Sequence, residues 1–252
     1  MHRKGYGYKM VLKEDNIIYE DEQILVCHKP SGIATQTAKL GCPDMESCIK
    51  NYLKSPYLGV VHRLDQPVEG ILVFGKTKEA AAKLSTQSME KHYYAVVLTD
   101  SLRFSIEDGK TVGIEHTLVD YLVRDGKSNT SRIAKKNEKD AKRAELVYCI
   151  LEEKKKDEGD EMSCLLVDIL LKTGRHHQIR VQMAHAGMPL YGDIKYGSES
   201  SVKQSIKSNK KEVALCAYSL SFLHPKTGKR MEFSILPKAD IFQDFHPVGK
   251  DI

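Results

Sequence analysis

The sequence predicts an α+β fold built on a large, mainly antiparallel sheet with helices beside it. Apolar runs with the spacing of strands outnumber those with helical spacing, and most segments between them are short enough for antiparallel pairing. The chain has 252 residues, of which 41% are hydrophobic and 29% charged, as in ordinary globular proteins. No internal repeat is visible. We therefore expect one sizeable domain or two lobes that share a core.

The first hundred residues show alternating strand and helix patterns. Residues 44–54 place five apolar side chains on one helical face, and Thr77 is a suitable N-cap for a second helix. Strand patterns are rich in Val, Ile and Tyr. The expected elements are strands over 17–28 with a turn near Asp21, a helix over 44–54, a strand over 71–74, a helix from Thr77 through Leu84, and a strand over 93–99.

Strands dominate the rest of the chain. The charged segment 152–161 separates two of them as a hairpin loop, and residues 225–228 form the turn of a final hairpin. Gly187 and Pro189 end the one helix expected here. The expected elements are strands over 115–123, 144–151 and 164–171, a helix over 177–186, and strands over 215–223 and 231–236.

The two ends differ in composition from the body of the chain. Residues 1–15 are polar and basic, which predicts a loose N-terminal arm before a domain over residues 16–240 and a C-terminal tail over 241–252. No apolar run approaches the roughly 20 residues that span a membrane, and no secretory signal is visible at the start. The six cysteines are scattered without a C-x-x-C pair, so we expect reduced thiols in a cytoplasmic protein.

Positive charge is concentrated in two segments. From Arg124 to Arg143 there are eight Lys or Arg residues and three acidic residues, whereas the whole chain carries a net charge of only +5. A second cluster consists of Lys203, Lys207, Lys210 and Lys211. Such patches attract polyanions by releasing counterions. A solvated loop is the alternative interpretation of each patch taken alone.

The run Val61-His62-Arg63-Leu64-Asp65 is the most informative motif. It places a carboxylate beside a His-Arg pair, directly before a strand led by Gly70. Neighbouring positive charge lowers the pKa of a carboxylate and keeps it ionised, as a nucleophile or electrostatic stabiliser requires. An Asp that only caps a turn would look the same in isolation, so the other motifs of the chain decide between the two interpretations.

Three further blocks accompany this motif in a fixed order. They are Lys29-Pro30-Ser31-Gly32, Lys91-His92-Tyr93-Tyr94-Ala95, and Thr173-Gly174-Arg175-His176-His177-Gln178-Ile179-Arg180, which continues into Tyr191-Gly192-Asp193. A closing pattern ends in His224-Pro225. Together, the blocks resemble those of the RluA-type pseudouridine synthase family over roughly residues 16 to 237. The resemblance implies a mixed sheet with flanking helices and loops around a central RNA-binding cleft.

The resemblance also implies the reaction. The glycosidic bond of a uridine in RNA is cleaved, the uracil is rotated, and a carbon–carbon bond is made to the same sugar. This isomerisation involves no net redox change or hydrolysis, so we expect no cofactor and no metal. The sequence agrees, because it has no nucleotide-binding glycine loop and no ligand-spaced Cys/His set. The expected partner is ribosomal or transfer RNA; no membrane or protein partner is expected, and the chain should act as a monomer.

The family's site residues map onto specific positions of this chain. Asp65 matches the catalytic aspartate, either as a nucleophile at the anomeric carbon or as a group that promotes loss of the 2′ proton. Tyr93 matches the tyrosine that stacks on the target base. Arg180 matches the arginine that pairs with the aspartate, which a guanidinium holds by bidentate hydrogen bonds. Substrate-binding roles are expected for His62, Arg63, Arg175 and His177.

The chain also departs from the family pattern. His28 stands where Asn is usual, Val68 and Glu69 replace a Thr-Ser pair, and Gln182 and Cys216 replace histidines that are frequent in the family. None of these positions is a predicted catalytic residue. The departures therefore bear on the choice of substrate more than on activity.

Two other functions are compatible with parts of the sequence. A non-catalytic RNA-binding protein on the same fold is the first, and the presence of all three predicted catalytic residues argues against it. A metal-dependent hydrolase is the second, using His62, Asp65, His176 and His177. Adjacent histidines point in different directions on a helix or strand, which argues against a shared ion.

Overall fold

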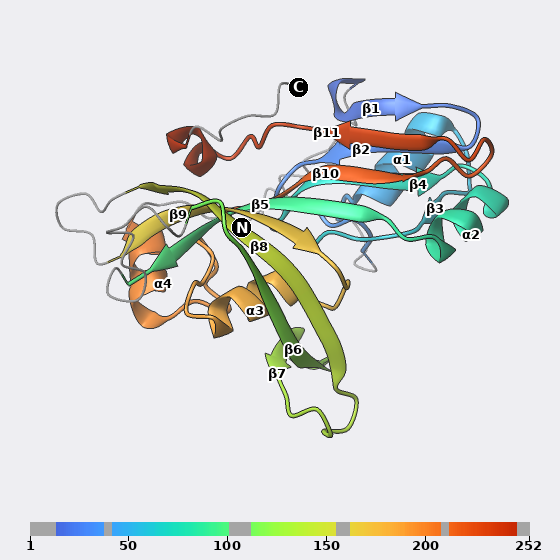
Figure 1. Cartoon of the computed structure of the whole chain (residues 1–252). Coiled ribbons are helices and arrows are strands. Elements are labelled where there is room, and N and C mark those ends of the chain that lie inside the picture. The colour runs from blue at the N-terminus through green and yellow to red at the C-terminus, as the bar shows by residue number, and fades with distance from the viewer. Residues whose placement is uncertain (1–13, 38–41, 101–111, 155–161, 208–211, 246–252) are drawn as a thin grey trace, which may run out of the picture. The chain divides into compact units, whose positions relative to one another are not determined.

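The computed structural model describes residues 14–37, 42–100, 112–154, 162–207 and 212–245 (Figure 1). The chain divides into two compact units. The first comprises the residues up to Met89 together with Ser221–Phe233, and the second comprises Glu90–Leu220 with the residues from Ser234 onward. The chain therefore passes from the first unit to the second, returns to the first for residues 221–233, and then continues in the second.

The first unit is a small sheet with two helices. Its strands run in the order β1, β2, β4 and the end of β10, with β3 paired to β4 and β11 paired to β10. Strands β2 and β4 are antiparallel and buried along their whole length. The elements are η1 Glu14–Asn16, β1 Ile17–Glu20, β2 Ile24–Lys29, α1 Met45–Leu53, β3 Gly59–Val60, β4 Glu69–Gly75, α2 Lys78–Thr86 and β11 Arg230–Ser234.

Both helices of this unit begin at capping residues, of which the sequence analysis identified Thr77. The Asp44 side chain accepts a hydrogen bond from the Ser47 amide at 2.7 Å, and the Thr77 hydroxyl accepts one from the Ala80 amide at 3.1 Å. Such caps satisfy amides that have no partner inside the helix. The two helices expected from the sequence are therefore confirmed.

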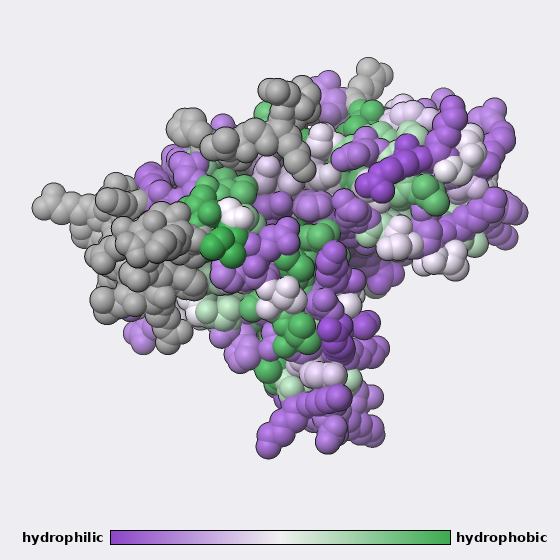
Figure 2. All heavy atoms as spheres, in the orientation of Figure 1, coloured by the Kyte–Doolittle hydropathy of each residue, from purple (hydrophilic) through white to green (hydrophobic). Residues whose placement is uncertain are grey.

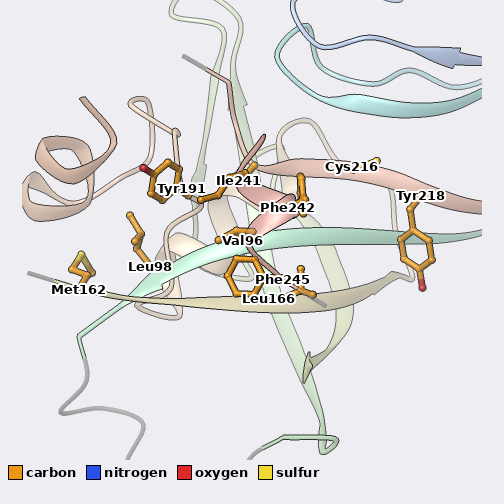
Figure 3. Packing of buried hydrophobic residues seen from close by; sticks show 11 residues of the cluster. Val96, Leu98, Met162, Leu166, Tyr191, Cys216, Tyr218, Ile241, Phe242 and Phe245 are labelled. Atoms are coloured by element: carbon orange, nitrogen blue, oxygen red, sulfur yellow. The ribbon is translucent and has the colours of Figure 1, made fainter. Parts of the chain in front are cut away.

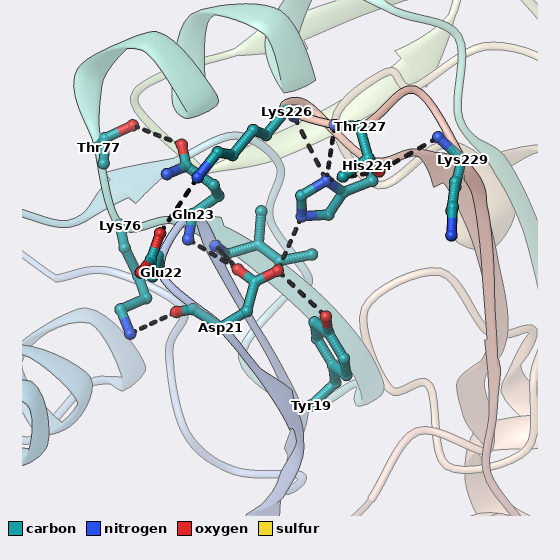
Figure 4. Close-up of polar contacts among 11 residues, drawn as sticks. Tyr19, Asp21, Glu22, Gln23, Lys76, Thr77, His224, Lys226, Thr227 and Lys229 are labelled. Carbon is teal, nitrogen blue, oxygen red and sulfur yellow. Dashed lines mark hydrogen bonds and ion pairs between the residues drawn. The ribbon is translucent and has the colours of Figure 1, made fainter.

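The turn after β10 is fixed by a buried histidine (Figure 4). Nδ1 of His224 accepts hydrogen bonds from the amides of Lys226 at 3.3 Å and Thr227 at 3.1 Å. Nε2 therefore carries the proton, and it donates to Asp21 Oδ2 at 2.8 Å. The Tyr19 hydroxyl donates to the same carboxylate oxygen at 3.1 Å. The closing His-Pro pattern of the sequence thus has a structural function, which is to join this turn to the one between β1 and β2.

The second unit contains the longest strands. Its sheet order is β10, β5, β9, β8, β6 and β7, and the pairs β5–β9, β8–β9, β6–β8 and β6–β7 are all antiparallel. Strands β6 and β8 form a long antiparallel pair, and the short strand β7 forms a hairpin with β6 on its other edge (Figure 1). The elements are β5 Glu90–Thr99, β6 Glu115–Asp125, β7 Thr130–Ile133, β8 Lys142–Lys154, β9 Ser163–Leu171, α3 Gln178–His185, α4 Glu199–Lys207, β10 Leu215–Leu223 and η3 Asp240–Asp244.

The core of the second unit lies between β5, β9, β10 and the C-terminal segment (Figure 3). Its members include Val96, Leu98, Leu166, Cys216 and Tyr218 from the strands and Ile241, Phe242 and Phe245 from η3 and the residue after it. Burial of these large side chains supplies the main driving force for folding. Ile241, Phe242 and Phe245, which the sequence suggested as part of a tail, thus belong to the packed core.

The predicted α+β class is confirmed, and every strand and helix proposed from the sequence is present. The sequence did not predict β3, β7, α4 or the two short 3-10 helices. Residues 1–13 of the expected N-terminal arm and residues 246–252 of the tail lie outside the described residues. All six cysteines are free thiols. Within the described ranges, no helix is long and apolar enough to cross a membrane.

Candidate active site

Asp65 lies in the loop between β3 and β4. The turn is closed by a hydrogen bond that the Val68 amide donates to the Asp65 carbonyl oxygen at 3.0 Å. The residue is half-buried. Thr35 holds the preceding residue from both sides, because its hydroxyl donates to the Leu64 carbonyl oxygen at 3.0 Å and accepts from the Leu64 amide at 3.1 Å. The backbone before the carboxylate is therefore fixed by a distant residue.

The Lys-Pro-Ser-Gly block fixes the backbone after Asp65. The Gly32 amide donates to the Gln66 carbonyl oxygen at 2.9 Å, and the Gln66 side-chain amide donates back to the Gly32 carbonyl oxygen at 3.0 Å. The Ser31 hydroxyl donates to the Pro67 carbonyl oxygen at 2.9 Å. These hydrogen bonds join two of the sequence blocks and fix the backbone directly after Asp65.

Lys29 is the buried centre of this arrangement. Its side chain has 0% exposure, and Nζ donates to the carbonyl oxygens of Pro30 at 2.9 Å, Ile33 at 2.6 Å and Gln66 at 3.2 Å. Burial lowers the pKa of Lys29 to about 8, and the negative charge of Asp65 opposes that shift. An ammonium has three protons to donate. Lys29 therefore acts on Asp65 as a fixed charge, while its hydrogen bonds go to the backbone.

His62 and Arg63 precede Asp65 in the same loop. Nε2 of His62 accepts a hydrogen bond from the Val73 amide at 3.1 Å, which gives this histidine a structural role at β4. Arg63 is exposed, and its Nη2 donates to Gln36 Oε1 at 2.8 Å. Contacts of either residue with RNA remain predictions.

Tyr93 and Tyr94 are neighbours on β5 and point to opposite faces of the sheet. Tyr93 is buried. The Tyr94 ring stacks on Tyr218, with ring centres 3.7 Å apart and planes at 3°, and the Tyr218 hydroxyl donates to Asp168 Oδ1 at 3.3 Å. Tyr94 thus belongs to a packed aromatic pair, and the stacking of Tyr93 on a target base stays a prediction.

Arg180 is held by a carboxylate that the sequence did not single out. On α3, its Nε lies 2.7 Å from Asp193 Oδ2 and its Nη2 lies 2.8 Å from Asp193 Oδ1, in a buried bidentate pair. The guanidinium also lies over the Tyr196 ring, 5.1 Å from its centre. These contacts restrict the orientation of Arg180. The Gly-Asp step of the third block was the sequence signal for Asp193.

Gly192 permits the chain to place Asp193 in this position. Its φ of +79° lies in the left-handed region, and a Cβ atom would come within 1.9 Å of the Glu212 carbonyl oxygen. Its amide donates to the Ser205 hydroxyl of α4 at 2.9 Å. No residue other than glycine fits here without a backbone shift.

His177 adopts a left-handed conformation, with φ of +53°, at the residue before α3. Its Nδ1 lies 2.6 Å from the Tyr196 hydroxyl, and its ring stacks on His176. Burial, followed by the charge of Arg180, lowers the pKa of His177 to about 3. The imidazole is therefore neutral, so a contact between His177 and RNA would be a hydrogen bond rather than an ion pair with phosphate.

The start of the third block is organised by Gln178. Its Oε1 accepts hydrogen bonds from the Thr173 hydroxyl at 2.8 Å and from the Arg175 amide at 2.9 Å, and its Nε2 donates to the Glu145 carbonyl oxygen at 3.0 Å. Nε of Arg175 donates to the Arg143 carbonyl oxygen at 2.9 Å. Of the two roles open to Arg175, fixing the loop is therefore observed, and phosphate binding remains a prediction.

The predicted site residues fall in both units. His62, Arg63 and Asp65 share one loop of the first unit, whereas Tyr93, Arg175, His177 and Arg180 belong to the second. The expected pairing of Asp65 with Arg180 stays a prediction. No group of three His, Cys, Asp or Glu side chains suited to a metal ion occurs among the described residues. His176, invoked for a hydrolase, lies close to Ser131 Oγ at 2.9 Å and Asn129 Oδ1 at 3.2 Å.

Comparisons with known proteins identify the family of this chain. Residues 23–185 match the RNA pseudouridylate synthase family. The chain is 30% identical over 241 residues to ribosomal large subunit pseudouridine synthase C of Buchnera aphidicola, covering 90% of this chain and 68% of the relative. It is 30% identical over 247 residues to ribosomal large subunit pseudouridine synthase D of Neisseria meningitidis, covering 90% and 59%.

A solved structure shares the fold. Human RNA pseudouridylate synthase domain containing 1 superposes with a TM-score of 0.66 at 20% identity, covering 88% of this chain and 83% of that one. The family match extends over more than half of the chain and includes the Asp65 turn, Tyr93 and α3. The chain therefore belongs to the RNA pseudouridylate synthase family, whose members are isomerases that act on uridine in RNA.

Proposed function

We propose that this protein converts uridine to pseudouridine in RNA, with Asp65 as the catalytic carboxylate. The bond between N1 of uracil and C1′ of ribose breaks, and a bond between C5 and C1′ forms after the base has rotated. The C5 proton is then lost, and N1 gains a proton. Atoms and electrons are conserved within the nucleotide, so the reaction requires a correctly positioned carboxylate and neither an oxidant nor a water molecule.

One observation carries this proposal, namely that the backbone on both sides of Asp65 is fixed by residues about thirty positions away. Thr35 holds Leu64, and the Lys-Pro-Ser-Gly block holds Gln66 and Pro67. Such support orients a reacting group before the substrate arrives, which is where enzymes gain much of their rate. A turn that only capped a strand would not need it.

Arg180 and Tyr93 complete the proposed chemistry. We assign to Arg180 the task of keeping the Asp65 carboxylate ionised and oriented, for which its restriction by Asp193 and Tyr196 is favourable. We assign to Tyr93 the task of stacking on the target base while the base rotates. A phenol with the ordinary pKa near ~10 is a weak base at neutral pH, so we assign stacking to Tyr93 rather than removal of the proton.

We further propose that the substrate is ribosomal RNA of the large subunit. The curated relatives named above act on that RNA by name. The chain spans 68% and 59% of their lengths. We propose that residues of the second unit contribute to recognition of the RNA, because this unit offers a charged surface.

This surface is formed by β6, β7, the start of β8 and the turns between them, residues 115–143, which we call the basic arm. Hydrophilic side chains cover its end (Figure 2). Two of its arginines form ion pairs, Arg132 with Glu138 and Arg143 with Glu145. All eight of its Lys and Arg residues are exposed, namely Arg124, Lys127, Arg132, Lys135, Lys136, Lys139, Lys142 and Arg143.

The basic arm is joined to the third sequence block. The Ser131 amide donates to the Tyr196 hydroxyl at 2.9 Å, and Lys195 Nζ donates to the Asn129 carbonyl oxygen at 3.0 Å. Tyr196 in turn contacts His177 and Arg180. We infer that contacts between the basic arm and RNA phosphates align the bound RNA with Arg180. In the second cluster, Lys203 is exposed on α4, and Lys210 and Lys211 lie outside the described residues.

The test is isomerisation of unmodified RNA. Transcripts of large-subunit ribosomal RNA and a pool of transfer RNA are incubated with the protein, and pseudouridine is located by carbodiimide labelling and primer extension. We expect pseudouridine in the ribosomal transcript, and none with Asp65→Asn, which removes one charge and keeps the side-chain volume. Activity of Asp65→Asn near the wild-type rate would refute the assignment. Binding of RNA without any isomerisation would favour the non-catalytic alternative.

A further inference from the structure

Three basic side chains converge on Asn129, in the turn between β6 and β7. Its Oδ1 atom accepts hydrogen bonds from Arg124 Nη2 at 3.4 Å and from His176 Nε2 at 3.2 Å. Its backbone carbonyl oxygen accepts one from Lys195 Nζ at 3.0 Å. One neutral residue thus supplies the acceptors for three basic groups, which come from three separate segments of the second unit.

His176 is held in the orientation that this cluster requires. A guanidinium can only donate, so the Asn129 atom that faces Arg124 is the amide oxygen, and Nε2 of His176 carries a proton. Nδ1 of His176 lies 2.9 Å from Ser131 Oγ, and the ring stacks on His177 with ring centres 3.7 Å apart. The Nε2 proton is therefore directed at Asn129 by contacts on the rest of the ring.

The turn itself places Asn129 between these groups. Arg124 of β6 pairs with Ser131 of β7, so the chain returns to the same point after the turn. Asn129 has a φ of +50°, a left-handed conformation that Asn adopts more readily than most residues. The carboxylate of the turn, Asp125, accepts a hydrogen bond from the Ser128 hydroxyl at 2.7 Å and so closes the turn.

The positive charge of the cluster is not neutralised locally. Among the described residues, no carboxylate forms an ion pair with Arg124 or Lys195, and both side chains are exposed. By contrast, Arg132 and Arg143 of the basic arm each pair with a glutamate. Positive charges that are held close together repel one another, and an anion bound between them would offset that repulsion.

The cluster is connected to the residue assigned to the reaction. His177, on which His176 stacks, lies 2.6 Å from the Tyr196 hydroxyl, and the Arg180 guanidinium lies over the Tyr196 ring. Burial, followed by the charge of Arg180, lowers the pKa of His177 to about 3, and the three basic groups of the cluster add to this shift. Positive potential therefore extends from the turn to this part of the site.

We propose that Arg124, His176 and Lys195 bind one phosphate of the RNA backbone, and that the Asn129 amide oxygen takes the place of a phosphate oxygen until RNA binds. Guanidinium, imidazole and ammonium groups suit the several oxygens of a phosphodiester. Phosphate contacts position a nucleic acid without reading its sequence, so this site would fix the RNA beside Arg180. The inference deepens the proposed function and rests on it, because RNA is the substrate there.

Two substitutions of Asn129 distinguish a phosphate site from a purely structural contact. Asn129→Asp adds a negative charge among the three basic groups, so affinity for the large-subunit transcript should fall by about tenfold or more. Asn129→Gly keeps the left-handed backbone and removes the competing oxygen, so affinity should stay within about twofold of the wild type. If Asn129 only held the turn, the expectations would be reversed. Asn129→Asp would then be tolerated, because hydrogen bonds to a carboxylate are stronger, and Asn129→Gly would lower both melting temperature and affinity.

The salt dependence of binding counts the phosphates that are contacted. RNA affinity is measured by filter binding at several NaCl concentrations for the wild type, Arg124→Gln, Lys195→Gln and the double variant. If both cations contact one phosphate, the slope of log affinity against log salt should fall by no more than about 0.7–0.9 in the double variant. Lys78→Gln is the matched control, because it removes the same charge from an exposed lysine of α2, outside the basic arm. We expect its slope to equal that of the wild type.

Several results would overturn the phosphate site. Equal RNA affinity of the wild type and Asn129→Asp is the first, and a fall in slope of about 1.4–1.8 in the double variant, which indicates two separate phosphates, is the second. The third concerns inorganic phosphate, added at constant ionic strength. If it raises the melting temperature of the wild type but not of Asn129→Asp, while both proteins bind RNA equally, the site binds free phosphate and not RNA.

These measurements are independent of the isomerisation assay. If the wild type binds RNA but makes no pseudouridine, the proposed function fails, and the affinities and salt slopes still decide the phosphate site. If pseudouridine is made and the variants of Asn129, Arg124 and Lys195 all bind as the wild type does, the proposed function stands and the phosphate site is refuted. If the wild type does not bind RNA, both fail.

Discussion

Asp193→Asn is the sharpest test of how Arg180 is held. The substitution keeps the shape of the side chain and one acceptor oxygen but removes the negative charge opposite a buried guanidinium. The side chains of Arg180 and Asp193 are 6% and 1% exposed, so solvent replaces little of what is lost. Breaking a buried ion pair from one side costs about 3–5 kcal/mol.

The expected shift in melting temperature follows from this figure. For a protein of this size, 1 kcal/mol moves the midpoint by about 2–4 °C. Asp193→Asn should therefore lower it by about 6–20 °C, as measured by circular dichroism on heating. The kcat for isomerisation should fall as well, because Arg180 would no longer be held in one orientation.

Glu138→Gln provides the matched control, because it removes the same charge from a carboxylate that pairs with Arg132 on the exposed basic arm. Exposed pairs are screened by water and salt, so the melting temperature should not change measurably. A midpoint for Asp193→Asn within about 2 °C of the wild type would show that the buried pair contributes little. In that case, the orientation of Arg180 would have to be explained by its contact with Tyr196.

Three other sets of substitutions test the remaining assignments. Tyr93→Phe should lower kcat while RNA affinity is kept, and Tyr93→Ala should also weaken binding, measured by filter binding, by about 1–3 kcal/mol. Full activity of both variants would place Tyr93 outside the site. Replacing Lys135, Lys136 and Lys139 with Ser should reduce the slope of log affinity against log salt by up to about 0.7–0.9 per lost contact, while kcat should not change. Identical salt titrations of the variant and the wild type would exclude the basic arm as an RNA contact. The pKa of His177 is about 3 in the folded protein and near ~6.5 when unfolded. The unfolded chain therefore binds the extra proton, and stability should fall as the pH drops from about 6.5 towards 3. Urea unfolding of His177→Asn should show a weaker pH dependence in that window, and an unchanged dependence would contradict the assigned pKa.

The elements that the sequence predicted well are those specified by local patterns. Asp44 and Thr77 mark helix starts because their side chains cap amides only three residues ahead. The short strand β7 was missed because Thr130–Ile133 has no apolar alternation. It is held instead by pairing with β6 and by the Tyr196 hydroxyl, which accepts from the Ser131 amide. Such tertiary contacts leave no periodic signal in the chain.

In the candidate site, too, residues within motifs could be predicted from the sequence, and contacts between distant residues could not. Asp65, Tyr93 and Arg180 could be proposed because the resemblance to a family supplied their roles. Asp193 was not singled out, since its partner Arg180 is thirteen residues away and no periodicity links the two. Lys29 lies in the Lys-Pro-Ser-Gly block, but its hydrogen bond to the Gln66 carbonyl oxygen spans 37 residues, so the sequence spacing could not predict it.

The long separation between the residues that shape the Asp65 turn has a consequence for folding. The hydrogen bonds from Ser31, Thr35 and Lys29 to this turn connect positions 29 to 37 residues apart. They form only once β2 and β4 have paired, after the entropy cost of closing that loop has been met. A peptide of residues 61–70 should therefore not adopt the turn on its own. In the intact protein, the amides of Leu64 and Val68 should exchange hydrogen through the same opening reaction that separates β2 from β4. Any event that separates these two strands would therefore also disassemble the site.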